Sequence, residues 1–568
     1  MSEHDELDRL IDEYARKKID RRGLIRGASA LGLSTLSILG LLSGSAPAAA
    51  SATGSARRPA RRPGSTEPRT GGTFIEGYDR GFSPITTVSA SWVDPTHEAL
   101  LESLVSFDPD GNIVSDLAES WESNAEATEW TFKIKEGVPF HSGAELTPEI
   151  VVENLNTYRE TGQHPYWFTQ IDSVEVGSEP ATVVVRTSAP FATLLELLQQ
   201  PFTNMYNPRT AEEAGDGYGT QVVDGTGPFR LAEFDAASHV LVERFEEYAG
   251  TGVPWVENKG PAYVDAVRWV AINEAANRAN EVISGTVHAI KQPLPADVEN
   301  LKANSDLVVI QQQEAAEVVL GLNFESTQLG FDDQRVRKAV SAAIDRQAIV
   351  DTVLFGLGFP LWGGFPPNYK WYEPETEMLN TFDPDLAREL LDEAGWTEGG
   401  DGTREKDGTA LSFEVINQTD ATRNLILEAM TAMLADVGVA ITPRNLEAGA
   451  YFDALGTDVD AYVFPALWTD FPRIYQVLAD SRFAPAPNWA RAAVAEVDAA
   501  MDLWQFAAND DDKEAAARAI QTAIAEHLPV IPLYGTDVVW VHNSKVHGWR
   551  PTNPVRLYPY YNDVWLEE

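Results

Sequence analysis

Alternation of hydrophobic and polar positions predicts a β-strand at residues 130–135, in which three large apolar side chains share one face: Trp130, Phe132 and Ile134. Gly137 ends the alternation. A helix is predicted to follow, because Thr147 is a natural N-cap and Pro148 fits the first helical position. Its apolar positions recur at helical spacing: Ile150, Val151, Leu155 and Tyr158. We therefore expect a strand, a turn and a helix that pack on one core.

Three longer segments also have helical periodicity, and they are predicted to be helices at residues 96–106, 332–354 and 489–527. In the second of them, Asp332 or Asp333 can cap the N-terminus. Its buried stripe consists of Val336, Val340, Ala343, Ile344, Val350 and Leu354.

Another helix is predicted to begin after Asp383, with Pro384 at its first position, and to end at Gly395 in left-handed geometry. Strands are predicted around these helices at residues 72–77, 174–176, 182–186, 238–245, 263–272, 412–417, 440–444 and 460–464. This succession of strands and helices predicts an α/β fold.

The sequence Gly-Thr-Gly-Pro-Phe at residues 225–229 predicts a tight turn, in which a glycine needs a positive φ and the proline fixes the next bend. A phosphate-binding loop is excluded here, because no lysine follows at the required spacing.

The chain is very acidic, with 43 basic and 86 acidic residues among 568. Residues 1–70 hold 12 basic and 8 acidic residues, which leaves a net charge of −47 on the rest. Such a surface repels nucleic acid and anionic membranes. Self-repulsion destabilises a compact state unless salt screens it, and the Debye length falls to about 3 Å in molar salt. The composition therefore favours a halophilic protein. An acidic disordered chain is excluded by the hydrophobic fraction of 44%.

Residues 1–50 are predicted to be a twin-arginine export signal, and residues 51–70 a flexible linker. Arg21 and Arg22 precede an apolar segment at residues 28–42, and a small-residue cleavage site follows. The linker is rich in Pro, Gly, Ser and Arg and lacks periodicity. We expect the protein to be secreted or at the extracellular face of the membrane, with an uncleaved signal as the alternative anchor. A thioether-linked lipid is excluded, because the chain has no cysteine.

Several stretches resemble, in order, the signature of the extracellular solute-binding proteins of ABC transporters, family 5, the peptide and nickel class: residues 120–121 (SW), 132–138 (FKIKEGV), 140–143 (FHSG), 147–149 (TPE), 225–229 (GTGPF), 331–346 (FDDQRVRKAVSAAIDR) and 382–396 (FDPDLARELLDEAGW). The export signal and the acidic composition add a resemblance to the haloarchaeal type. The resemblance implies a periplasmic-binding-protein-like fold of type II, in the large cluster C form. Such a fold has two α/β lobes around a ligand cleft and an extra inserted subdomain.

On this basis the expected domains are a signal segment (1–50), a linker (51–70), the first lobe in three parts (71–120, 216–315 and 531–568), an inserted subdomain (121–215) and the second lobe (316–530).

A ligand site is expected around Asp470, which follows the strand at residues 460–464, because loops at strand ends bind ligands in open α/β sheets. The resemblance implies that an acidic residue here takes the ammonium of a peptide; the alternative is a surface carboxylate. Arg473 could pair with the ligand's carboxylate or bridge the lobes. The other candidate ligand-binding residues are Ser89, Ser91, Trp92, Asn323, Trp362, Phe365, Trp468 and Phe471. For the aromatic members, a place in the core is the alternative.

The expected function is a non-enzymatic receptor for ABC import of di- or oligopeptides, with no cofactor and no metal. The chain has no G-x-S-x-G, H-E-x-x-H or P-loop motif, and without cysteine it has no thiolate chemistry. A nickel chelate or an oligosaccharide is an alternative cargo, and a secreted hydrolase with a carboxylate pair is the alternative from another class. The expected partners are a peptide or other small solute and the permease and ATPase complex. We expect a monomer.

We predict that the folded protein loses its compact structure as KCl or NaCl falls well below molar concentration, because the charge of −47 is then no longer screened. The near-UV circular dichroism spectrum and the melting temperature across a salt series measure this. A spectrum and a melting temperature that do not change in low salt would contradict the halophilic interpretation.

Overall fold

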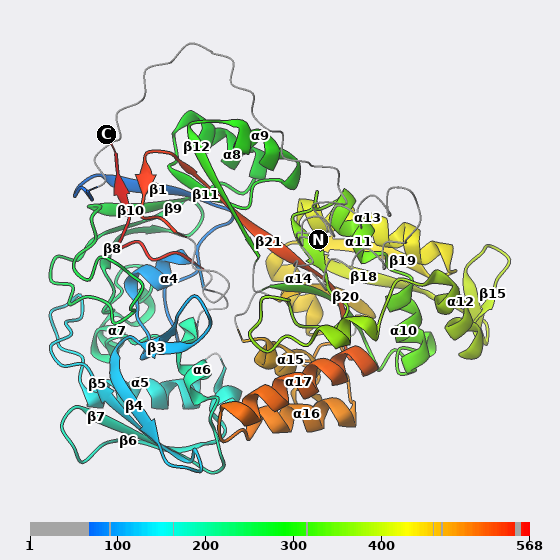
Figure 1. The fold of residues 1–568 in the computed structure, drawn as a ribbon, viewed down its shortest axis with the longest axis horizontal. Coiled ribbons are helices and arrows are strands. Elements are labelled where there is room, and N and C mark those ends of the chain that lie inside the picture. The colour runs from blue at the N-terminus through cyan, green and yellow to red at the C-terminus, as the bar shows by residue number, and fades with distance from the viewer. Residues whose placement is uncertain are drawn as a thin grey trace, which may run out of the picture. The chain divides into compact units, whose positions relative to one another are not determined.

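The structure is a computed structural model that describes residues 67–89, 93–162, 164–313, 316–457, 459–466, 470–550 and 558–567, without the side chains of Ala448 and Phe471. These residues belong to one compact unit, Glu67–Glu568 (Figure 1). The predicted export signal, most of the predicted linker, Ser91, Trp92 and Trp468 lie outside the described residues. Among the described residues, no helix is both long and apolar enough to cross a membrane.

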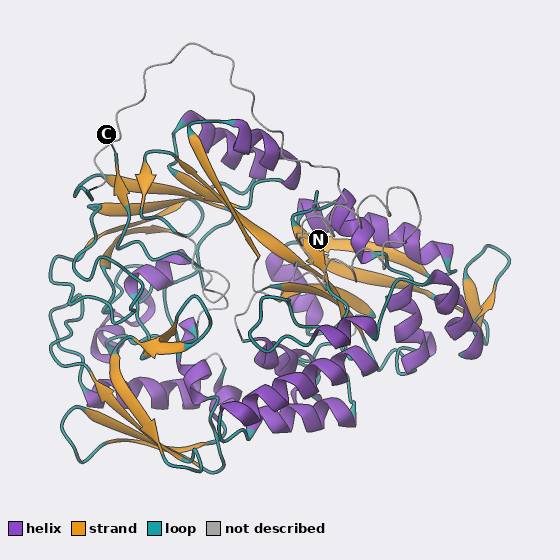
Figure 2. Cartoon of the chain, viewed as in Figure 1, coloured by secondary structure: helices purple, strands orange, loops and turns teal. Residues whose placement is uncertain are grey.

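A mixed sheet of twelve strands runs through this unit (Figure 2). Its strands are, along the main path, β19 (Ala440–Leu446), β18 (Ser412–Gln418), β20 (Ala461–Ala466), β13 (Glu317–Leu322), β21 (Ile531–Asn543), β11 (Ala289–Lys291), β1 (Thr73–Tyr78), β10 (Ala266–Ala271), β9 (His239–Arg244) and β8 (Phe229–Asp235), with β12 (Leu307–Gln313) and β14 (Gly358–Pro360) beside β21.

Strand β21 is shared by two halves of this sheet. Its first residues pair with β13 and β14, and its later residues pair with β11 and β12. We call the half with β1 and β8 to β12 the first lobe, and the half with β13, β14 and β18 to β20 the second lobe. The α/β fold predicted from the sequence is thus confirmed, with one continuous strand that belongs to both lobes (Figure 1).

A separate four-stranded sheet and its helices form what we call the insertion: β4 (Ala118–Ser123), β5 (Glu129–Ile134), β6 (Ile171–Val176), β7 (Thr182–Thr187), α5 (Pro148–Thr161), η1 (Pro165–Phe168), α6 (Leu194–Leu198), η2 (Pro201–Thr203) and α7 (Pro208–Ala214). The predicted strand is β5, and Trp130, Phe132 and Ile134 are buried as expected. The Thr147 hydroxyl caps α5 by accepting the Ile150 N–H at 3.5 Å. The strand, turn and helix predicted there are confirmed.

The remaining described helices of at least six residues are α4 (Pro95–Leu100), α8 (Ala275–Ser284), α9 (Val298–Ala303), α10 (Gln334–Ala342), α11 (Arg346–Thr352), α12 (Pro384–Glu393), α13 (Ala421–Asp436), α14 (Ala448–Leu455), α15 (Phe471–Ala479), α16 (Ala495–Gln505) and α17 (Asp510–His527). The shorter strands are β2 (Val105–Phe107), β3 (Ile113–Ser115), β15 (Thr397–Glu398), β16 (Arg404–Lys406), β17 (Thr409–Ala410), β22 (Val546–His547) and β23 (Trp565–Leu566). Helix α12 has the predicted cap, since the Asp383 carboxylate accepts the Leu386 N–H at 2.9 Å, and Gly395 has a φ of 87°.

Three of the predicted helices were too long. The helix expected at residues 332–354 is two helices, because Asp345 caps α11 by accepting the Ala348 N–H at 2.9 Å. The stripe from Val336 to Leu354 is nevertheless buried throughout. The helix expected at 489–527 is α16 and α17, separated by the cap at Asn509. The helix expected at 96–106 ends at Leu100, and β2 follows it.

The predicted reason for the glycines at residues 225–229 was wrong. Neither Gly225 nor Gly227 has a positive φ. Instead, the Gly227 N–H donates to the Leu100 carbonyl at 3.0 Å, and a Cβ at Gly227 would stand 2.6 Å from the Leu100 carbonyl carbon. Glycine is required here because two backbone segments touch.

We predict that Gly227→Ala lowers the free energy of unfolding by about 1–3 kcal/mol, because backbone atoms at Leu100 cannot move away as a flexible side chain could. Gly400→Ala is the matched control, since no atom lies within 4 Å of its added Cβ. Urea unfolding in molar KCl measures both. Equal, small changes in the two variants would show that the close approach at Gly227 does not constrain the residue.

Candidate ligand cavity

A cavity of about 1490 Å³ is lined by the first lobe, the second lobe and the insertion. Its wall includes residues 78–82 at the end of β1, 273–276 after β10 and 418–424 at the end of β18. Strands β1 and β10 are parallel neighbours, and β18 is parallel to β20. Loops at the carboxyl ends of parallel strands are where open α/β sheets bind ligands. The volume exceeds the range of about 300–1,000 Å³ for small-molecule pockets, so it leaves room for an extended ligand.

The N-terminus of α13 brings Asp420 and Arg423 to this wall. The Asp420 carboxylate caps the helix by accepting the Arg423 N–H at 2.8 Å. The Arg423 guanidinium is positioned by Nε, which donates to Asn417 at 3.2 Å, and by Nη2, which donates to the Gln418 carbonyl at 3.3 Å. Its Nη1 makes no hydrogen bond to a described residue. Arg423 can therefore offer a positioned cation to an anionic group of a ligand.

Three cations and one carboxylate meet at the end of β1. The Arg80 guanidinium donates twice to Asp79, at 3.0 and 2.9 Å, and Arg278 and Lys291 also line the cavity. Burial opposes ionisation of Asp79, but the attraction of Arg80, Arg278 and Lys291 outweighs burial and lowers its pKa to about 2. The Lys291 ammonium lies 5.1 Å from the centre of the Trp540 ring. The Asp79 carboxylate thus stays charged on both sides of neutral pH.

Burial raises the pKa of two other carboxyl groups of the wall. Burial raises the pKa of Glu102 to about 8, with a further contribution from the neighbouring Asp116, although the Tyr248 hydroxyl donates to Glu102 at 2.6 Å. Burial also raises the pKa of Glu317, which accepts from the Tyr475 hydroxyl at 2.7 Å. The cavity wall therefore carries less negative charge than the composition of the chain implies.

Aromatic side chains from the insertion and the second lobe form another part of the wall: His164, Tyr166, Phe202, Phe464 and Trp489. The Phe464 and Trp489 ring centres are 5.1 Å apart. His164 Nδ1 lies 2.9 Å from the Tyr166 hydroxyl, and burial lowers the pKa of His164 to about 4, which leaves the ring uncharged at neutral pH. This surface suits apolar and aromatic groups of a ligand.

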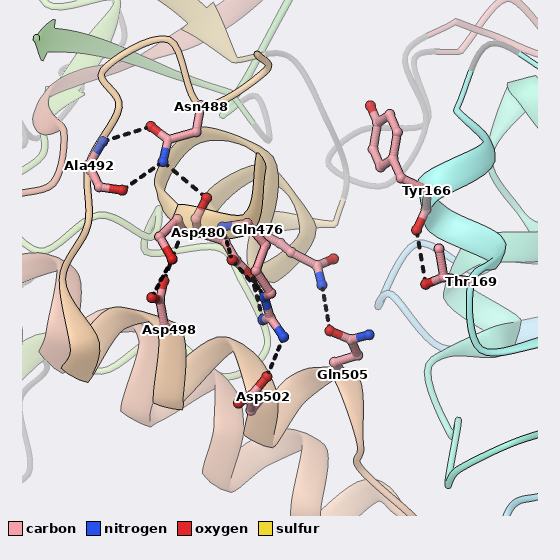
Figure 3. A network of polar contacts seen from close by, with 11 residues as sticks. Tyr166, Thr169, Gln476, Asp480, Asn488, Ala492, Asp498, Asp502 and Gln505 are labelled. Atoms are coloured by element: carbon pink, nitrogen blue, oxygen red, sulfur yellow. Dashed lines mark hydrogen bonds and ion pairs between the residues drawn. The ribbon is translucent and has the colours of Figure 1, made fainter. Parts of the chain in front are cut away.

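The loop that carries Pro487 and Trp489 into the wall is held by a polar network (Figure 3). The Asn488 amide donates to the carbonyls of Asp480 and Ala492 at 3.0 and 2.9 Å. The Asp498 carboxylate of α16 accepts the Ser481 hydroxyl at 2.6 Å. These bonds fix the loop from within the second lobe, so its part of the wall is formed before a ligand arrives.

Asp470 and Arg473 lie together at the start of α15, but not in the cavity wall. The Asp470 carboxylate caps the helix by accepting the Arg473 N–H at 3.3 Å, and it accepts from Arg473 Nε at 3.1 Å. Both side chains are buried, with 3% and 4% exposed. Burial raises the pKa of Asp470 even though Arg473 opposes the shift. Arg473 also lies 5.7 Å from the centre of the Trp167 ring, in the insertion.

The other described candidates also lie outside the wall. The Asn323 side chain is buried and donates to the Val459 carbonyl at 3.0 Å. Phe365 is fully buried and stacks on Tyr475, with ring centres 5.7 Å apart. Trp362 lies against the buried Arg346 guanidinium, at 4.1 Å. Ser89 is exposed, and the side chain of Phe471 is among those not described.

Several wall residues were missed by the sequence analysis although they have the signal that was used for Asp470. Asp420 and Arg423 follow the strand predicted at residues 412–417, and Asp79 and Arg80 follow the first strand. Each pair closely follows the end of a strand. Among the described residues, no group of three or more His, Asp or Glu side chains is arranged to hold a metal ion.

Known proteins similar to this chain were found by sequence and by structure. The family model of bacterial extracellular solute-binding proteins, family 5 Middle, matches residues 112–484. The glutathione-binding protein GsiB of Salmonella typhimurium is 27% identical over 359 residues, which cover 62% of this chain and 65% of that relative. GsiB of Pectobacterium atrosepticum is 26% identical, over 66% of this chain and 68% of the relative.

Solved structures share the fold. The oligopeptide-binding protein AppA of Bacillus subtilis, in complex with a nonapeptide, has a TM-score of 0.76 and 22% identity, covering 88% of this chain and all of AppA. NikZ of Campylobacter jejuni, in complex with Ni(L-His), has a TM-score of 0.73 and 20% identity, covering 86% of this chain and 97% of NikZ. The match of the family model over more than half of the chain identifies it as a member of the bacterial extracellular solute-binding proteins of family 5.

Proposed function

We propose that this protein is the extracellular receptor of an ABC importer and captures di- or oligopeptides, which it delivers to the membrane permease. The observation that carries the proposal is the large cavity between the lobes, with charged groups of both signs and an aromatic surface in its wall. A peptide presents the matching groups, namely an ammonium, a carboxylate and apolar side chains. Relatives support this cargo, since GsiB is named for glutathione and AppA was solved with a nonapeptide.

In this proposal Arg423 binds the carboxylate of the peptide, because its guanidinium is positioned and has an unused donor among the described residues. Asp470 remains the proposed partner of the ammonium. Because it lies outside the cavity wall in this structure, its carboxylate would have to turn toward the cavity and exchange part of its contact with Arg473 for the ligand. The aromatic wall receives apolar side chains. Backbone hydrogen bonds and bridging waters supply the rest of the affinity.

In this proposal, high salt limits which interactions can contribute to ligand affinity. With a Debye length of about 3 Å in molar salt, long-range attraction of a charged peptide is screened. Affinity then depends on contacts that closure of the lobes removes from solvent. The ligand shifts an open–closed equilibrium by its higher affinity for the closed form, and the closed form is what the permease and ATPase complex would recognise.

The proposal also covers the export route of the protein, its cellular location and its adaptation to salt. We propose export by the twin-arginine route through the Arg21–Arg22 signal, followed by secretion or by anchoring through an uncleaved signal. The acidic composition supports a halophilic, haloarchaeal-type protein. We propose a monomer without enzymatic activity that does not bind nucleic acid.

The first test identifies the cargo. Small molecules that co-purify with the native protein are expected to be peptides by mass spectrometry, and glutathione, dipeptides and tetrapeptides are expected to raise the melting temperature in molar KCl. A shift with nickel–histidine alone would instead favour the nickel-chelate alternative, since NikZ was solved with Ni(L-His). A shift with oligosaccharides alone would favour that cargo. Hydrolysis of peptides or glycosides in turnover assays would favour the hydrolase alternative.

We predict that Asp470→Asn weakens binding of peptides with a free amino terminus by roughly 2–5 kcal/mol, because the ammonium is left buried without a counter-charge. Asparagine is also a good N-cap, so the start of α15 is preserved. Calorimetry with matched free and amino-acetylated peptides measures the effect.

The acetylated peptides serve as the control, because they lose their ammonium but keep every other group. They are expected to lose far less affinity in the variant. A fold defect, or the loss of the counter-charge of Arg473, would weaken the binding of both kinds of peptide by the same amount. Equal losses would therefore exclude Asp470 as the partner of the ammonium.

A further inference from the structure

The insertion touches the second lobe through a set of contacts that does not involve the shared sheet. In Figure 1, α6 of the insertion lies beside the N-terminal end of α17, and β21 crosses between the lobes at another place. Glu196 of α6 and Lys513 of α17 make the contact. We call this set of contacts the bridge.

The centre of the bridge is a buried ion pair. Lys513 Nζ lies 2.7 Å from Glu196 Oε1, and only 7% and 6% of the two side chains are exposed. Lys513 also contacts Asp510 of its own helix at 2.7 Å, and that carboxylate is largely in solvent. Burial opposes the charge of Lys513, but Glu196 and Asp510 outweigh burial and raise its pKa. Lys513 is therefore a cation that lies between the carboxylate of Glu196 in the insertion and that of Asp510 in α17.

Polar and aromatic contacts surround this pair. The Gln170 amide of the insertion donates to the Gln505 carbonyl at 3.0 Å. The Ala192 N–H donates to the Ala507 carbonyl at 2.8 Å. The Tyr166 ring of the insertion lies 5.3 Å from the Phe483 ring. Helices α15, α16 and α17 thus all contribute to the bridge, directly or through the segment that follows them.

The bridge and β21 border the cavity in different ways. On the side of β21, the lobes are joined by backbone hydrogen bonds of one continuous strand. At the bridge, the insertion and the second lobe are joined mostly by side chains, next to wall residues such as Tyr166, Gln200 and Leu478. A rotation of the lobes about the shared strand would therefore separate the bridge while leaving the sheet intact.

We propose that Glu196 and Lys513 form a latch that holds the lobes closed over the cavity without touching the cargo. The role of the latch in cargo retention rests on the proposed function, whereas the opening of the lobes does not. Glu196 Oε2 is buried without a hydrogen-bond partner among the described residues. The closed pair thus keeps an uncompensated desolvation cost, and water would satisfy both groups in the open form. This balance makes the latch reversible.

The test measures the separation of the insertion and the second lobe in the absence of any cargo. The chain has no cysteine, so two spin labels can be placed without background at Glu122→Cys in β4 and Thr522→Cys in α17, both exposed positions. Pulsed electron–electron double resonance in molar KCl gives the distribution of distances between the labels. The 568-residue chain is used throughout, including its N-terminal segment.

In the labelled protein, Lys513→Met is expected to move most of the distribution to longer distances, because the buried Glu196 then loses the cation that it contacts directly and is fully hydrated only in the open form. Glu196→Gln combined with Lys513→Met is expected to restore the shorter distances at least in part, because the unpaired carboxylate is gone. The control is Asp392→Asn, which removes an ion pair with Arg404 inside the second lobe and is expected to leave the distances unchanged.

A second readout follows the dissociation of glutathione and of tetraalanine by stopped flow. Lys513→Met is expected to speed the dissociation of both at least tenfold, and the double variant to recover most of this loss. An unchanged distance distribution in Lys513→Met, with a lower melting temperature, would overturn the latch and make the bridge a static contact. If neither peptide binds the unmodified protein, the proposed cargo fails, while the label distances still decide whether the latch exists.

Discussion

Strand β21 constrains everything else in this structure, because its backbone groups must be hydrogen-bonded in both lobes at once. Its pairing passes from β13 and β14 to β11 and β12 along one run of residues. Gly535 stands where β14 pairs with it, and the Phe359 ring occupies the space that a side chain would fill. The order of strands on either side of β21 fixes which loops reach the cavity. The ligand site is thus a consequence of sheet topology.

The cavity wall has a different charge composition from the strongly acidic chain as a whole. The surface carries most of a formal charge of −43, but the wall gathers four cations: Arg80, Arg278, Lys291 and Arg423. Arg278 is held by the carbonyls of Ile272, Asn273 and Gln292. Salt screens charges on the surface, whereas it weakens the contacts of the buried Arg278 much less. A cavity built in this way keeps its binding chemistry in a solvent that screens the charges on the exterior.

The sequence predicted local elements well where a cap and a periodic pattern agreed, as at Thr147 and Asp383. It failed where a cap interrupted a stripe that stayed buried on both sides, as at Asp345 and Asn509. Periodicity cannot detect such breaks, although the capping residues themselves could have. The need for glycine at residue 227 depends on Leu100, which is distant in the sequence.

The candidate site was harder to predict for a related reason. Asp79, Asp420 and Asp470 all follow strands, and the pattern alone gives them equal weight. Only the strand order shows that the first two reach the cavity wall, while the third pairs with Arg473. Trp362 and Phe365 illustrate the same limit, because an aromatic residue of a cavity and one of a core have the same sequence signature. The ligand-binding roles of these residues remain predictions.

The neutral Glu102 has a consequence for folding itself. Its pKa is about 8 in the folded protein and 4.5 when exposed, and Glu76 behaves similarly, with a folded pKa of about 7. Between these values the native chain binds more protons than the unfolded chain. These two groups therefore take up protons on folding at neutral pH, and their contribution to stability is full below about pH 4.5 and declines as the pH rises to 8. At alkaline pH the protein loses the contribution of these two groups to its stability, and screening by salt does not restore it.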